Sequence, residues 1–67
     1  MTPTPADIRA AREAAGISQT AAGALCHRSL RAWQAAESGE RNLDRAAWEL
    51  FLLLTDQHPD LVLSPRR

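Results

Sequence analysis

Two polar residues, Arg31 and Gln34, lie close together in a segment that has the pattern of an amphipathic helix. With Leu30 and Ala35 they form a stripe at positions i, i+1, i+4 and i+5, which share one side of a helix. The residues expected on the inward side are Ala32, Trp33, Ala36 and Glu37. Arginine and glutamine on an exposed helical stripe are the side chains that pair with guanine and adenine edges in a major groove.

The stripe must be positioned by a pair of short helices within residues 18–39. Ser18 can cap the first helix and Ser29 the second. Gly39 follows the second helix, and glycine adopts the left-handed backbone conformation that ends a helix at the lowest energetic cost. Gly23 has no side chain, so the second helix can approach the first closely at this point. Two helices of this length joined by a tight turn are the layout of a helix-turn-helix.

The remaining segments complete a single all-α domain that spans residues 1–67. Thr4 can cap a first helix, and Pro5 fits the first helical position, where no N–H is needed. The expected helices cover about 5–15, 19–25, 29–37 (the recognition helix) and 43–55, with a C-terminal dimerisation segment over about 59–63. The pattern predicts a compact four- or five-helix fold without strands.

The last long helix is the most apolar segment. One stripe carries Leu43, Ala47, Leu50, Phe51 and Leu54, and a second carries Trp48 and Leu52. A helix apolar over so much of its circumference is buried on more than one side, and a chain of 67 residues is too small to cover both sides. We therefore expect a homodimer, with the interface residues Trp48, Leu52, Leu61, Val62 and Leu63.

Composition agrees with a small intracellular domain. The formal net charge is zero, but all eight basic residues are arginine, and four of them lie between Arg28 and Arg45. The single cysteine excludes an internal disulfide, and no secretory signal or membrane span is apparent. We therefore expect a cytoplasmic location.

No group of residues predicts catalysis or metal binding. The carboxylates are scattered, and there is neither a nucleophile in a glycine elbow nor a glycine-rich loop after a strand. Cys26, His27 and His58 have poor spacing for a zinc site, so Cys26 is interpreted as a small buried thiol. We expect no enzyme activity, no metal, no cofactor and no small-molecule ligand.

The motif as a whole resembles that of the Cro/repressor-type (XRE) helix-turn-helix regulators of phages and bacteria. The matching residues are Gln19, Gly23, Ser29, Trp33, Glu37 and Gly39, and the resemblance covers about residues 6–55. Within that family, residues 30–34 and 47–51 look most like small phage-encoded autorepressors, including anti-CRISPR-associated regulators. Two residues depart from the family pattern. His27 stands where glycine is usual, although histidine tolerates a left-handed backbone. Arg28 stands at a usual apolar core position and must point outward or snorkel.

The resemblance implies a lambda-repressor-like helix-turn-helix fold. It also implies a transcriptional repressor that binds a palindromic operator in double-stranded DNA as a homodimer and regulates its own promoter. It implies base contacts by Arg28, Arg31 and Gln34. It implies phosphate contacts by Gln19, Ser29, Arg41 and Asn42. It also implies a buried ion pair between Arg12 and Glu37.

Other interpretations stay open for these residues. Gln19 can simply be solvated, Arg41 and Asn42 can be ordinary loop residues, and Ser29 is first of all a helix cap. One alternative function is an antitoxin-like protein-binding module that uses the apolar face of the last long helix. A third interpretation is a helix-turn-helix scaffold without DNA binding, which the outward Leu30 and Ala35 would fit.

Overall fold

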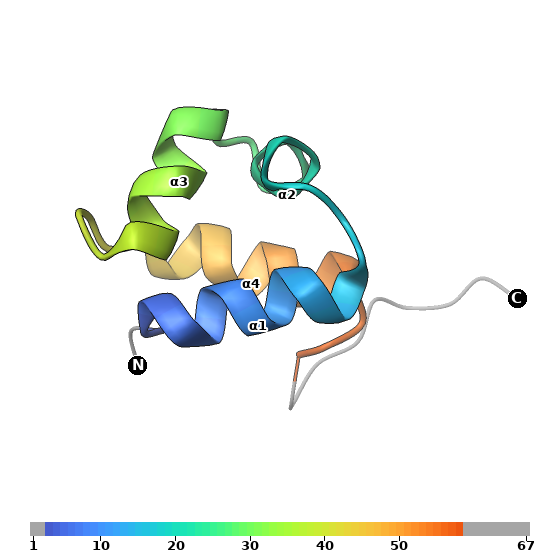
Figure 1. Ribbon diagram of the computed structural model, residues 1–67. Coiled ribbons are helices and arrows are strands. Elements are labelled where there is room, and N and C mark those ends of the chain that lie inside the picture. Colours follow the sequence, from blue (N-terminus) through green and yellow to red (C-terminus); the bar gives the residue numbers. More distant parts are fainter. Residues whose placement is uncertain (1–2, 59–67) are drawn as a thin grey trace, which may run out of the picture.

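The computed structural model describes residues 3–58, which contain four α-helices and no strand. The helices are α1 (Pro5–Ala15), α2 (Gln19–Leu25), α3 (Leu30–Ser38) and α4 (Arg45–Leu54). α2 packs against α3 and α4, and α1 packs against α3. In Figure 1, α1 and α4 run alongside each other, and α2 and α3 lie on one side of them. The all-α helix-turn-helix fold expected from the sequence is confirmed. The segment expected over 59–63 lies outside the described residues.

A side-chain oxygen caps the start of every helix. Thr4 Oγ1 accepts a hydrogen bond from the Asp7 backbone N–H at 3.1 Å, and Asp7 Oδ2 accepts one from the Thr4 N–H at 3.1 Å. The caps of the other three helices are Ser18, Ser29 and Asp44. These bonds satisfy N–H groups that have no partner within the helix, so they fix where each helix begins.

Two helix boundaries differ from those that the sequence indicates. α4 begins at Arg45 because Asp44 is its cap, so Leu43 lies before the helix. α3 includes Ser38 and stops at Gly39, which has a left-handed φ of 87°. Glycine adopts this conformation without the clash that a Cβ would cause. The chain can therefore turn sharply away from the end of α3.

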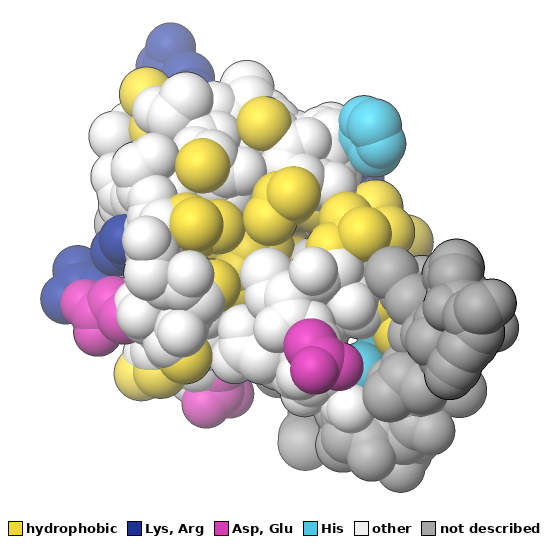
Figure 2. All heavy atoms as spheres, turned by 90° about the vertical axis from the view of Figure 1, so that its right-hand side faces the viewer, with side chains coloured by type: hydrophobic (Ala, Val, Ile, Leu, Met, Phe, Trp, Pro, Cys, Tyr) yellow, Lys and Arg dark blue, Asp and Glu magenta, His cyan; other side chains and the backbone are white. Residues whose placement is uncertain are grey.

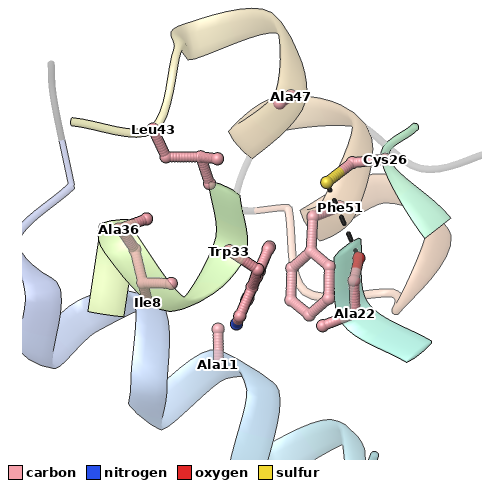
Figure 3. Close-up of a cluster of buried hydrophobic side chains, with 9 residues drawn as sticks. All are labelled: Ile8, Ala11, Ala22, Cys26, Trp33, Ala36, Leu43, Ala47 and Phe51. Atoms are coloured by element: carbon pink, nitrogen blue, oxygen red, sulfur yellow. Dashed lines mark hydrogen bonds between the residues drawn. The ribbon is translucent and has the colours of Figure 1, made fainter. Parts of the chain in front are cut away.

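Trp33 and Phe51 form the centre of the hydrophobic core. Both side chains are fully buried, and their ring centroids are 4.9 Å apart with 46° between the planes. The other core residues are Ile8, Ala11, Ala22, Cys26, Ala36, Leu43 and Ala47, which cluster around the two rings in Figure 3. Because many of these residues are small, the helices can approach the two rings closely. Trp33 therefore anchors α3 to the rest of the domain.

The two apolar stripes of α4 are not separate in the structure. Trp48 and Leu52, expected on the second stripe, are partly buried and pack against the core. Trp48 stacks on Phe51 with 6.3 Å between ring centroids. Leu54, expected to face the core, is 42% exposed because it is the last residue of α4. Trp48 and Leu52 also line a shallow, mainly apolar hollow between α1 and α4, which we call the α1–α4 hollow.

The chain after α4 is tied back to α1. Asp56 has a left-handed φ of 61°, which turns the chain at the end of the helix. The Gln57 side-chain amide then donates a hydrogen bond to the Ala11 carbonyl oxygen at 3.0 Å. This contact joins residues that are 46 positions apart, so it holds the segment after α4 against α1.

Candidate nucleic-acid interface

The turn between α2 and α3 depends on a close approach of backbone to Gly23. A Cβ built on Gly23 would lie 2.8 Å from the carbonyl oxygen of Arg28 and 3.1 Å from that of Ser29. The Gly23 carbonyl oxygen accepts a hydrogen bond from the Arg28 N–H at 2.8 Å. His27 adopts a left-handed φ of 60° between the helices, a conformation that histidine tolerates. The turn thus holds the first residues of α3 against α2.

Leu30, Arg31 and Gln34 form the exposed face of α3. Ala35, which the sequence places on the same face, is instead buried, with 8% of its surface exposed. Its carbonyl oxygen accepts hydrogen bonds from the backbone N–H groups of residues 39–41. The loop after α3 folds back over Ala35 for this reason, so the predicted exposure of Ala35 is wrong.

Two arginines beside α3 have no carboxylate oxygen within 4.0 Å among the described residues. The arginines with a carboxylate oxygen within 4.0 Å are Arg9, Arg12, Arg28 and Arg45. The other two in residues 3–58, Arg31 and Arg41, pair with no described residue. Arg31 and Arg41 line the same hollow, which Ser29 and Glu40 also line. We call it the Arg31–Arg41 hollow. By contrast, the face in Figure 2 has apolar side chains in its middle, and the basic side chains that it shows lie at its edges.

The structure does not bring Arg28 together with Arg31 and Gln34. The Arg28 guanidinium lies 2.7 Å from Asp44 Oδ1 through Nη2 and 3.1 Å through Nε, and its Nη1 donates to the His27 carbonyl oxygen. The hydrogen bond from Arg28 holds the pKa of the Asp44 carboxyl below its ordinary value. Arg28 therefore links the turn to the start of α4. It lines neither the Arg31–Arg41 hollow nor the second hollow beside α3, whose lining residues are Leu30, Arg31, Gln34, Ala35, Ser38 and Glu40.

Beneath this surface, three side chains donate four hydrogen bonds to the buried carboxylate of Glu37. Arg12 Nε donates to Oε2 at 2.5 Å and Nη2 donates to Oε1 at 3.2 Å. Trp33 Nε1 donates to Oε2 at 2.6 Å, and Gln19 Nε2 donates to Oε1 at 3.1 Å. Charge-assisted bonds of this kind are stronger than those between neutral groups. The network joins α1, α2 and α3 at one carboxylate.

The protonation of Glu37 follows from these contacts. Burial raises the pKa of the Glu37 carboxyl, but the hydrogen bonds from Arg12, Trp33 and Gln19 outweigh that effect, so the pKa lies below its ordinary value. The hydrogen bond to Glu37 in turn raises the pKa of Arg12. Both groups therefore stay charged near neutral pH, and the ion pair is maintained.

Gln19 connects this interior network to the exposed face of α3. Its Nε2 donates to Glu37, while its Oε1 accepts a hydrogen bond from Gln34 Nε2 at 3.3 Å. An amide group has two N–H donors, so Gln19 keeps one donor beyond these two contacts. Gln34 is therefore held at one end, and its carbonyl oxygen and second N–H have no bond within the described residues.

The remaining candidate residues have different surroundings. Ser29 Oγ accepts a hydrogen bond from the Ala32 N–H at 3.0 Å, so Ser29 is the N-cap of α3. Ser29 also lines the Arg31–Arg41 hollow. Asn42 is exposed and lines neither hollow beside α3. The buried Cys26 thiol donates to the Ala22 carbonyl oxygen, and burial raises the thiol pKa. Among residues 3–58 no group of three metal-ligating side chains comes together.

No helix in the described part of the chain has the length and apolarity needed to cross a membrane.

Comparison with known proteins places this arrangement in a family. No curated protein sequence matches the chain. A family model described as a helix-turn-helix domain matches residues 6–63, which is most of the chain. The matched region includes α2, the turn at His27 and α3 with Arg31 on its exposed face. The chain therefore belongs to the helix-turn-helix domain family, of the Cro/repressor-like kind, a DNA-binding fold.

Proposed function

We propose that the chain is a sequence-specific transcriptional repressor that binds double-stranded DNA. It is a binding protein and not an enzyme, and it acts in the cytoplasm. The observation that carries the proposal is the pair of arginines, Arg31 and Arg41, which lie beside the exposed face of α3 and form no ion pair within the described residues. In helix-turn-helix proteins the second helix enters the major groove with its N-terminal residues on base edges. Arg31 lies at that end of α3.

The contacts divide into those that read bases and those that position the helix. Arg31 and Gln34 read base edges, since both are exposed and Gln34 retains an unbonded carbonyl oxygen and N–H. The residues that bind phosphates are Gln19, Ser29, Arg41 and Asn42. We leave Arg28 out of the base-reading set because Asp44 and the His27 carbonyl already hold its guanidinium. Repression then follows from occupation of a promoter.

The protein acts as a homodimer on a palindromic operator. The α1–α4 hollow, with Trp48 and Leu52, offers an apolar surface that a second copy would cover. The other proposed interface residues, Leu61, Val62 and Leu63, lie outside the described residues. Twofold symmetry presents two copies of α3, and the half-sites would lie about 34–36 Å apart.

The resemblance to small phage autorepressors extends the proposal to the controlled gene. On that basis the operator lies in the promoter of the protein's own gene, and the protein is phage-derived and related to anti-CRISPR-associated regulators. The α1–α4 hollow also favours a second candidate function, an antitoxin-like module in which that surface binds another protein.

Selection from a pool of random duplexes, followed by gel-shift titration on the DNA upstream of the gene, tests the main proposal. We expect enrichment of an inverted repeat and a shift of the upstream fragment that contains it. Failure to enrich any sequence, together with a monomer in sedimentation, would favour the protein-binding module. Enrichment of a sequence by a protein that sediments as a dimer favours the repressor.

A further inference from the structure

Leu30, the first residue of α3, exposes a large apolar side chain. It is 41% exposed, and among the described large hydrophobic residues only Leu54, at 42%, is exposed to a similar extent. Isolated apolar side chains on a surface are common and need no special explanation. The significance of Leu30 therefore depends on its neighbours and not on its exposure alone.

Leu30 lies among the residues proposed to read bases. It lines one hollow together with Arg31 and Gln34. Leu30 and Gln34 are four positions apart, so their side chains lie one turn apart on the same side of α3. Ser29 caps the helix directly before Leu30, which places Leu30 at the N-terminal end that enters a major groove.

A leucine in this position has one suitable partner among the groups of the major groove. The base edges present hydrogen-bond donors and acceptors, except for the C5-methyl group of thymine, which is apolar. Leucine forms no hydrogen bond with a phosphate or a base edge, whereas it can bury a methyl group. Gln34 on the next turn suits adenine, whose partner base is thymine.

We infer that Leu30 selects a thymine in the operator by packing against its 5-methyl group. The thymine lies in or beside the base pairs that Arg31 and Gln34 contact. This inference rests on the proposed function and adds a base preference that no hydrogen-bonding side chain provides. It also gives the exposed Leu30 a role in DNA binding, where the sequence alone left it as a feature of an inactive scaffold.

Deoxyuridine substitution tests this inference, because deoxyuridine pairs like thymidine but lacks the methyl group. The duplex selected by the wild-type protein is prepared with each thymidine replaced in turn, and affinities are measured by fluorescence anisotropy. We expect one position in each half-site at which the loss of the methyl weakens wild-type binding about fourfold. That factor corresponds to about 0.8 kcal/mol for one buried methyl(ene) group.

The Leu30→Ala variant tests whether Leu30 is the side chain that contacts this methyl group. It should bind the thymidine duplex more weakly than wild type and should no longer distinguish deoxyuridine at that position. Leu54→Ala is the matched control, since it truncates the other exposed leucine and should keep the wild-type discrimination. Equal binding of all substituted duplexes by wild type, or full discrimination retained in Leu30→Ala, overturns the inference while DNA recognition stands. If selection enriches no duplex, the proposed function fails and the inference fails with it.

Discussion

The guanidinium of Arg12 on α1 and the carboxylate of Glu37 on α3 form a two-point ion pair, with 2.5 Å from Nε to Oε2 and 3.2 Å from Nη2 to Oε1. The same carboxylate accepts a hydrogen bond from the Gln19 side chain, and Gln19 accepts a hydrogen bond from Gln34 on the exposed face of α3. The pair therefore fixes the position of α3 and also supports one of the side chains proposed to read DNA.

Replacement of Arg12 should destabilise the domain strongly. Arg12→Ala leaves the Glu37 carboxylate buried without its cation, which costs about 3–5 kcal/mol, towards the lower end because Trp33 and Gln19 still donate to it. Urea denaturation measures the loss in the free energy of unfolding. Arg9→Ala is the control, since the Arg9 side chain is 62% exposed and 3.7 Å from Glu37, and exposed pairs contribute about 0–1 kcal/mol. Equal, small losses in the two variants would contradict a structural role for the pair.

The same carboxylate predicts how stability depends on pH. The pKa of Glu37 is lower in the folded protein than its ordinary value of about 4.3, so the unfolded chain binds a proton first as the pH falls. The stabilisation is therefore complete above that ordinary value and is lost as the pH falls through the folded pKa. Glu37→Gln should show a shallower decline of the urea midpoint between neutral and acidic pH than wild type. Parallel declines would place the acid sensitivity elsewhere, for example at Asp44, whose pKa is also lowered.

The close approach at Gly23 predicts that Gly23→Ala lowers the stability of the protein, although the same substitution inside most helices raises it. Gly→Ala inside a helix usually stabilises by about 0.5–1 kcal/mol. Here the new Cβ would lie 2.8 Å from the Arg28 carbonyl oxygen, so the turn must shift. We expect Gly23→Ala to destabilise by about 1–3 kcal/mol, as overpacking does, with a lower midpoint in thermal unfolding. A raised midpoint would show that the turn yields without cost.

The features predictable from the sequence are those that local chemistry decides. Ser18 and Ser29 cap their helices because the hydroxyl oxygen accepts a hydrogen bond from the N–H three residues later. Gly39 ends α3 because glycine adopts the left-handed backbone conformation without a steric clash. The inward position of Trp33 follows from helical periodicity. These local signals predicted an all-α helix-turn-helix fold of four or five helices, and the structure confirms this fold class with four helices in the described residues.

The features that sequence reasoning missed depend on segments far apart in the chain. Ala35 is buried by the loop that follows α3, which periodicity within the helix does not reveal. Arg28 pairs with Asp44 across 16 positions, and Gln57 bonds to Ala11 across 46. The indole–carboxylate bond from Trp33 to Glu37 was detectable, since the two residues are four apart on the inward side of one helix.

The proposed homodimer predicts that charge placed in the α1–α4 hollow will separate the subunits. Ala10 lines that hollow from α1 and is exposed, so Ala10→Glu should keep the fold and yield monomers in sedimentation equilibrium. Leu52→Glu should act in the same direction but also lower stability, because Leu52 packs on the core. Ala46→Glu, on an exposed part of α4 outside the hollow, should remain dimeric. A monomeric wild type at micromolar concentration would contradict the dimer as proposed.

Arg31 and Arg41, which form no ion pair within residues 3–58, should affect DNA binding differently. A bidentate contact from Arg31 to a guanine contributes about 1–3 kcal/mol of discrimination. Arg31→Ala should therefore weaken operator binding and relax the preference at one base pair in each half-site. Arg41→Ala should weaken binding to operator and scrambled DNA alike and reduce the slope of log K against log salt by about 0.9 per lost phosphate contact. Titrations of both variants on both duplexes across a salt series separate these roles. Identical behaviour of the two variants would show that Arg31 binds phosphate, and loss of base preference in Gln34→Ala alone would move the reading of sequence one turn further along α3.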